Sequence, residues 1–458
     1  MVNLVRKRER VLFVGLPLAM LAALYCFIAT RIVLADGGNA GPDEIARLLV
    51  PKAMLSGKLL PSGYDSETIL GWGYYSYAFY PQMLGAYVTS AFMAVARLFG
   101  ASPVMQLYVA RLSSVLWGLV GAFFAGKAVA TLTSSDKGVR YEYGAIGTLF
   151  VGCWPQYAYL SSYVNNDIVG LAGVSVLLCA LVVGVKRGWK PSSAALLVVG
   201  IVVCALGYLN TYGFILAGVV TFIVTCLSQY QDNRAQAVRL ILLSALACAV
   251  CTFPFFVVNI VRYGDVIGSR AFEAQYDRWV AEGGEELLKP YTDGAFSLLF
   301  GRLTFVEKTV KSFIGYFGYF SAPLPASFHL FFGGSLLLLT GAFLGNAKYV
   351  QSAFCKKWRL FTVSVAIACV ITVCLHVWRT LTTDYQAQGR YIIDILIPWG
   401  IVAVLGGISM LAPMRKGIWV CVALYVLAFV AGMVLTMHLY GWESFTATSD
   451  EFLRMVIP

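Results

Sequence analysis

The chain alternates long apolar runs with short polar segments along its whole length. A helix needs about 20 mainly apolar residues to cross a bilayer core of about 30 Å. On length and hydropathy, the pattern predicts eleven transmembrane helices, at Val11–Ala35, Val104–Leu132, Tyr143–Tyr163, Ile168–Val185, Ser193–Leu209, Tyr212–Ser228, Val238–Val261, Ala326–Gly345, Leu360–Trp378, Ile392–Ala412 and Ile418–Tyr440.

Two longer polar segments, Asp36–Pro103 and Arg262–Pro325, separate these runs. Amphipathic patterns inside them, at Glu44–Leu55, Glu273–Ala281 and Phe305–Phe320, are too polar for the bilayer centre and too apolar for open water. Such patterns are typical of helices that lie in the membrane interface. We therefore expect one integral membrane domain over 1–458, with outer loops at 36–103 and 262–325 and no separate soluble domain.

Charge decides the position of Pro81–Phe99, an apolar run of borderline length. If this run lies on the outer surface, every short inner loop is basic, as the positive-inside rule requires, and the N-terminus is inside. Only four of the 23 acidic residues then fall inside, namely Glu9, Asp136, Glu142 and Asp232. If the run spanned the membrane, the basic cluster Lys186–Lys190 would face outward.

Composition supports this reading of the pattern. The chain is 59% hydrophobic and 12% charged, with a mean hydropathy of +0.76, and it lacks the short alternating segments of a membrane barrel. The predicted fold class is an all-α polytopic membrane protein with about eleven transmembrane helices and interfacial helices in two large outer loops. Its net charge of +11 is explained by the inner loops, so we expect no nucleic-acid partner.

The first candidate site is the acidic pair Asp43-Glu44, early in the first outer loop. Carboxylates after Pro42 also suit the first turn of a helix, where they complement the helix dipole. A carboxylate at the outer mouth of a membrane cavity can alternatively act as a general base. Adjacent carboxylates point in different directions on a helix, so only one is expected to reach a substrate.

Two further polar groups fall on the same side of the membrane. Asn166 and Asp167 lie in a short outer turn, where they could cap the next helix. They could alternatively contact an acceptor hydroxyl or, together with Asp43, hold a divalent cation such as Mg²⁺ or Mn²⁺. Arg390 and Tyr391 could be interfacial anchors, but an Arg fork also suits a lipid-linked phosphate. Asp394 follows as a partner for Arg390 or a substrate contact.

Weaker candidates remain. Arg111 and Arg270 are further phosphate ligands to consider, and Tyr75 belongs to an aromatic group that could stack on a sugar or form an interfacial belt. The sequence has no nucleotide-binding, zinc-protease or serine-hydrolase motif with the right context. The predicted spans carry no mid-membrane charge, which counts against ion-coupled transport.

The chain resembles the GT-C superfamily of membrane glycosyltransferases, and within it a poorly characterised bacterial family. The resemblance is carried by Gly41-Pro42-Asp43-Glu44, by Pro155 through Val164-Asn165-Asn166-Asp167, and by Gln388-Gly389-Arg390-Tyr391. It implies a polyprenyl-phosphate-linked sugar donor, with Asp43 or Glu44 as base, Asp167 at the acceptor or a metal, and Arg390 at the donor phosphate. Asp394, which precedes Ile395-Leu396-Ile397-Pro398, departs from the uncharged stretch expected there.

We therefore expect an inverting glycosyltransferase in the bacterial cytoplasmic membrane, with its active site on the outer face. Its partners would be the lipid-linked sugar, a cell-envelope or lipid-linked glycan acceptor, and membrane lipids. A transporter or flippase of lipid-linked precursors is the alternative. A membrane acyl- or phosphotransferase is a third possibility and would use His376 or His438.

Overall fold

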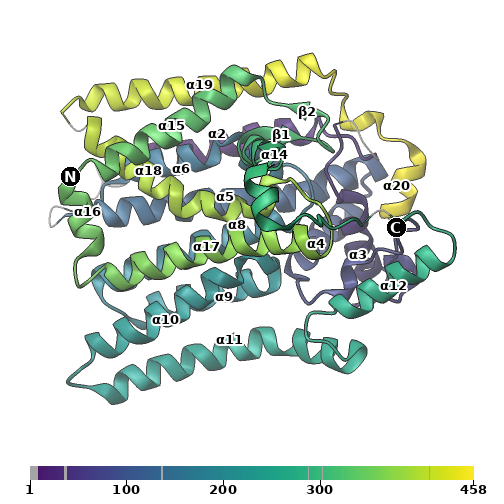
Figure 1. Ribbon diagram of the computed structural model, residues 1–458, viewed down its shortest axis with the longest axis horizontal. Helices are drawn as coiled ribbons and strands as arrows, with labels where there is room; N and C mark the ends of the chain where they lie inside the picture. Colours follow the sequence, from purple (N-terminus) through teal and green to yellow (C-terminus); the bar gives the residue numbers. More distant parts are fainter. Residues whose placement is uncertain (1–8, 36–38, 136–137, 287, 302, 412) are drawn as a thin grey trace.

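The structure is a computed structural model, and it describes residues 9–35, 39–135, 138–286, 288–301, 303–411 and 413–458. In these ranges, nine helices are long and apolar enough to cross a membrane, and they run side by side as one bundle (Figure 1). They are η1–α2 (Val11–Ala29), α5 (Pro103–Leu132), α8 (Asp167–Arg187), η4–α10 (Leu209–Gln229), α11 (Arg234–Tyr263), α15 (Ala326–Leu344), α17 (Arg359–Thr382), η6–α18 (Gly389–Leu411) and α19 (Arg415–Leu439).

Two of the eleven predicted spans have a different form. The run expected at 143–163 is divided into α6 (Tyr141–Gly152) and α7 (Pro155–Leu160). Pro155 has no N–H for a continuous helix, and the Trp154 indole between the two helices donates to the Phe313 carbonyl at 2.7 Å. The run expected at 193–209 is α9 (Pro191–Gly207), a shorter apolar helix of 17 residues.

Pro81–Phe99 contains α4, which at 15 residues is about 22 Å long and shorter than a bilayer core. The other elements are α3 (Glu44–Leu55), η2 (Ser66–Thr68), η3 (Tyr77–Phe79), α12 (Ser269–Ala281), α13 (Gly294–Phe296), η5 (Ser297–Gly301), α14 (Leu303–Gly315), β1 (Tyr316–Phe317), β2 (Ala322–Pro323), α16 (Ala347–Phe354), η7 (Phe445–Ala447) and α20 (Asp450–Val456). Helices α3, α4, α12 and α20 and the strands β1 and β2 lie toward one end of the bundle, at the right of Figure 1, and α16 lies at the opposite end.

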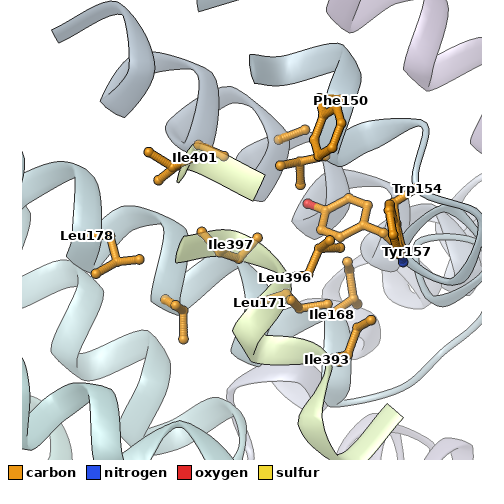
Figure 2. Close-up of a cluster of buried hydrophobic side chains, with 14 of the residues drawn as sticks. Phe150, Trp154, Tyr157, Ile168, Leu171, Leu178, Ile393, Leu396, Ile397 and Ile401 are labelled. Carbon is orange, nitrogen blue, oxygen red and sulfur yellow. The ribbon is translucent and has the colours of Figure 1, made fainter. Parts of the chain in front are cut away.

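Helix α8 is the centre of the bundle and is buried over nearly its whole length. It packs against α5, α9, α10 and α18, so its apolar side chains contact protein on all sides. Figure 2 shows the part of this core where η6 and α18 meet α8, with side chains Phe150, Trp154, Tyr157, Ile168, Leu171, Leu178, Ile393, Leu396, Ile397 and Ile401. The same packing positions the ends of α8 and η6, which carry Asp167 and Arg390.

Candidate active site

A polar cavity of about 140 Å³ lies where α3, α8, α17 and η6 end. It is bounded on its other sides by the aromatic segment around η3 and by η4. Its lining residues are Asp43, Arg47, Tyr75, Tyr77, Tyr80, Gln82, Asn166, Asp167, Tyr208, Leu209, Asn210, Phe272, Leu375, His376, Arg379, Arg390 and Tyr391. Four elements far apart in the sequence, α3, α8, α17 and η6, therefore bring three arginines and two aspartates to one space.

Asp43 faces this cavity because of an unusual backbone conformation. Helix α3 begins at Glu44 rather than at Pro42, and Asp43 precedes it with φ 64° and ψ 3°, in the left-handed region. Few residues other than Gly adopt this conformation, and when Asp does, a functional reason is worth seeking. The Asp43 side chain does not cap α3. Its Oδ2 instead accepts a hydrogen bond from Arg390 Nη2 at 2.8 Å.

This ion pair controls the charge of Asp43. Burial alone would raise the pKa of the Asp43 carboxyl, but the positive charges of Arg390 and Arg47 outweigh it and hold the pKa below its ordinary value. Asp43 is therefore ionised at neutral pH. It is also a weaker base for as long as Arg390 remains its partner.

Arg390 is positioned by close packing of η6 on α14. The Gly389 N–H donates to Ser312 Oγ at 2.5 Å, and a Cβ on Gly389 would overlap the Phe313 nitrogen and the Thr309 carbonyl oxygen. Only glycine fits at this approach of two backbones. The Nε of Arg390 is buried without a partner in the described part of the chain, so it has donor capacity to offer a ligand.

We expect Gly389→Ala to disturb this site. The added methyl must push η6 away from α14, which moves Arg390 and destabilises the fold by overpacking at a cost of about 1–3 kcal/mol. Thermal unfolding in detergent measures the loss. Gly334→Ala in α15 is the matched control, since its Cβ would meet nothing within 4 Å. Equal melting temperatures for the two variants would contradict this packing.

Glu44 points the opposite way, into the protein core. Arg111 donates to both carboxylate oxygens of Glu44, at 2.9 and 2.7 Å, and the Val164 N–H adds a third bond at 3.0 Å. Arg111 Nη1 also donates to the carbonyls of Ala29 and Ile32. Glu44 and Arg111 are 1% and 0% exposed and do not line the cavity. The adjacent carboxylates thus point in different directions, and Arg111 is placed at Glu44 rather than at the cavity.

The first residue of α8, Asp167, and the residue before it, Asn166, line the cavity. The neighbouring Asn165 performs the capping role, since its Oδ1 accepts from the Ile168 N–H at 2.9 Å. Asn166 donates to the Gln82 carbonyl at 3.2 Å. Asp167 is 3% exposed, and its Oδ1 has no partner in the part of the chain that the structure describes.

The other predicted residues divide between the cavity and its surroundings. Tyr75 and Tyr391 line the cavity, whereas Arg270 is exposed outside it. Asp394 is fully buried next to the cavity, and neither of its carboxylate oxygens has a partner among the described atoms. It is therefore no ion-pair partner of Arg390. His376 lines the cavity and stacks on Tyr391 with a centroid distance of 5.6 Å, while His438 is exposed and outside the lining.

Two arginines of the cavity were not among the predicted site residues. Arg47 lies one turn into α3 after Asp43, with its guanidinium 3.8 Å from the centroid of the Tyr77 ring. Arg379 lies in the last turn of α17. Neither forms a salt bridge to a described carboxylate. The spacing of four residues, which places Arg47 one helical turn after Asp43, is the signal that could have identified Arg47.

Asp43 and Asp167 are the residues considered for a divalent cation, and both line the cavity. Within the described ranges, no group of three or more His, Cys, Asp or Glu side chains is arranged to hold a metal. Asp43 also has Arg390 as its partner. A divalent cation held by Asp43 and Asp167 stays a prediction.

Comparisons with known proteins give the fold. No protein-family model and no curated protein matches this sequence. The solved structures of ArnT from Cupriavidus metallidurans are similar to it. The structure in the apo state is 16% identical to this chain with a TM-score of 0.45. The match covers 88% of this chain and 60% of the ArnT chain. The structure bound to undecaprenyl phosphate is 15% identical to this chain with a TM-score of 0.50. The match covers 97% of this chain and 74% of the ArnT chain.

This chain thus spans 60% to 74% of the length of the ArnT chains that it matches. At such low identity, the second structure establishes the architecture and nothing about chemistry. The comparison therefore gives the fold alone: the chain is a multi-span, all-α membrane protein that shares its fold with the ArnT structure bound to undecaprenyl phosphate.

Proposed function

We propose that this protein is a glycosyltransferase that takes its sugar from a polyprenyl-phosphate donor. The observation that carries the proposal is the cavity in which Asp43, Asp167 and three arginines converge at one end of a membrane bundle. The fold supports it, because a protein of the same fold was solved with undecaprenyl phosphate bound. We place the cavity on the outer face of the cell membrane, because the opposite end of the bundle carries the basic loops.

The charges of the cavity suit a lipid phosphate. Arg47, Arg379 and Arg390 bring three positive charges, and Asp43 and Asp167 bring two carboxyl groups. A sugar-phosphate-lipid diester carries one negative charge, and the phosphate monoester released from it carries more. Arginine binds such oxygens with two parallel hydrogen bonds. We therefore assign Arg47, Arg379 and Arg390 to the phosphate, and not the previously considered Arg111 and Arg270.

Asp43 acts as the general base in this proposal. It takes the proton from the acceptor hydroxyl, whose oxygen attacks the anomeric carbon of the sugar while the bond from that carbon to the phosphate oxygen breaks. The arginines stabilise the charge that develops on the leaving phosphate, so no strong general acid is required. A single displacement inverts the anomeric centre. The acceptor would be a cell-envelope or lipid-linked glycan that enters near Asn166 and Asp167.

The ion pair between Asp43 and Arg390 links donor binding to basicity. A bound phosphate competes with the Asp43 carboxylate for the Arg390 guanidinium. When Arg390 turns to the phosphate, its positive charge is shared between the phosphate and the Asp43 carboxylate. The pKa of Asp43 is then lowered less than in the free protein. Asp43 would thus become an effective base only when the donor is in place.

The Arg390→Gln variant tests this link through its pH dependence. Protonation of the base makes kcat/KM fall at acid pH. Because Arg390 lowers the pKa of Asp43, this fall should lie below about pH 4 in the wild-type protein. Removing this charge takes away the first of the causes that lower the pKa while burial still raises it, so the fall in kcat/KM should move to higher pH. Arg278→Gln, far more exposed and paired with Glu282, is the control. If kcat/KM of Arg390→Gln fell at the same pH as in the wild type, Arg390 would not lower the pKa of the base.

The function itself is tested with the purified full chain in nanodiscs, offered a panel of polyprenyl-phosphate sugars and a membrane extract as acceptor source. Release of polyprenyl phosphate, the product shared by all such donors, is followed by mass spectrometry. We expect release with at least one donor, and we expect no transfer of sugar to the extract when a nucleotide sugar replaces the lipid-linked donor. Movement of the intact lipid across vesicles without sugar release would instead support the transporter alternative and refute the proposal.

A further inference from the structure

A second, larger cavity lies at the opposite end of the same helices. It is an apolar groove of about 870 Å³ between α17 and α18, with α8 at its floor and α16 and the end of α15 at its inner mouth. Helix α17 packs on α10, whereas α18 packs on α15 and α6. The two helices therefore separate toward the end where α16 lies, at the left of Figure 1. None of the groove residues belongs to the candidate active site.

The length of the groove matches one leaflet of a bilayer. Along α17 its lining runs from Trp358 beside the helix start to Cys369, eleven residues later, which is about 16 Å at the helical rise. Half of a bilayer core of about 30 Å is about 15 Å. The groove thus accommodates an acyl chain that enters from the inner leaflet and ends near the bilayer midplane.

The mouth of the groove is positively charged. Of its described lining residues, only Arg140 and Lys186 carry a charge, and both are basic. Lys186 is fixed in place by three hydrogen bonds, to the carbonyls of Thr131, Leu132 and Ser134 at 2.7–2.8 Å. Lys357 joins the cluster by donating to the Lys186 carbonyl at 3.1 Å. The Arg140 guanidinium is exposed beside the mouth and contacts the Tyr143 hydroxyl at 3.2 Å.

We propose that this groove binds one anionic glycerophospholipid of the inner leaflet, with one of its acyl chains between α17 and α18 and its phosphate at Arg140, near the positive charge of Lys186. An apolar channel with a basic mouth selects an amphiphile whose head is anionic, since each Lys or Arg near a membrane surface favours the binding of an anionic lipid. The depth of one leaflet fits a phospholipid chain better than a long polyprenyl chain.

The site would also affect the far ends of the two helices. The outer end of α17 carries Arg379, and η6, which leads into α18, carries Arg390. A chain lodged between the helices sets their separation at the inner end. The lipid is thus a structural partner of the bundle, and it is distinct from the lipid-linked donor, whose phosphate we place in the other cavity.

Native mass spectrometry of the delipidated full chain tests the site, with dioleoylphosphatidylglycerol, dioleoylphosphatidylcholine and undecaprenyl phosphate added separately. We expect one phosphatidylglycerol to bind at least about tenfold more tightly than phosphatidylcholine. Ala366→Trp, which fills the groove from α17, should abolish this binding, and Val370→Trp, on the same helix outside the groove, should not. Arg140→Gln should remove the preference for the anionic head, and Arg234→Gln should retain it.

The exposed position of Arg140 keeps the test decisive if Ala366→Trp fails to fold. Three results would overturn the proposal. One is equal affinity for the two phospholipids in the wild-type chain. Another is unchanged preference in Arg140→Gln. The third is stoichiometric displacement of phosphatidylglycerol by undecaprenyl phosphate, which would identify the groove as a site for the lipid carrier.

Discussion

Asp43→Asn is expected to lower sugar transfer by about two to four orders of magnitude, the usual contribution of a general base. The variant keeps the size of the side chain, and Asn adopts the left-handed backbone conformation as readily as Asp, so the fold around φ 64° is retained. Release of polyprenyl phosphate in nanodiscs measures the effect. The melting temperature, measured in parallel, separates lost chemistry from lost structure.

The matched control for this variant is Asp277→Asn, an exposed position on α12 outside the cavity. It should transfer sugar at the wild-type rate. Glu44→Gln separates the two neighbouring carboxylates, because we expect its folded fraction to remain active. Transfer at the wild-type rate by Asp43→Asn, or an inactive but fully folded Glu44→Gln, would move the base away from Asp43.

The second large effect concerns stability. Arg111→Leu removes the only cation that touches the buried Glu44 carboxylate among the described residues. Breaking a buried ion pair from one side typically costs about 3–5 kcal/mol, because the remaining charge stays buried without compensation. Arg111 also joins α5 to the end of α2, through the Ala29 carbonyl, and to the chain after it, through the Ile32 carbonyl. We expect a large fall in the thermal midpoint or no folded protein.

A double variant makes this prediction specific. Glu44→Leu together with Arg111→Leu removes both charges and should be more stable than either single variant. Arg278→Gln, in the exposed pair with Glu282, should leave the midpoint unchanged. If Arg111→Leu melted like Arg278→Gln, the buried pair would not hold α3 and α5 together.

Hydropathy predicted the membrane bundle well because lipid imposes length and apolarity on every span. Nine of the eleven predicted runs are helices of spanning length in the described chain. The break at Cys153–Trp154 was not predicted, although Pro155 marks it, because apolar composition continues through the break. Burial of the interrupted backbone inside the protein allows it.

The candidate site was predicted in part. Asp43, Asp167, Arg390 and Tyr391 were singled out by position on one side of the membrane, and the fold brings them to one cavity. The sequence could not tell Asp43 from Glu44, because the difference is a single backbone angle that turns one side chain to Arg390 and leaves the other to Arg111. Arg47 was hidden in an amphipathic helix, where an arginine usually indicates a solvated face.

Binding of undecaprenyl phosphate to the full chain, followed by native mass spectrometry, tests the central claim most directly. If Arg390 divides its bonds between Asp43 and a lipid phosphate, Arg390→Gln should bind at least about tenfold more weakly than wild type. Asp43→Asn, which frees Arg390, should bind as tightly as wild type or more tightly. Equal affinity in wild type and Arg390→Gln, or weaker binding by Asp43→Asn, would contradict the account of this cavity as a phosphate site with a paired base.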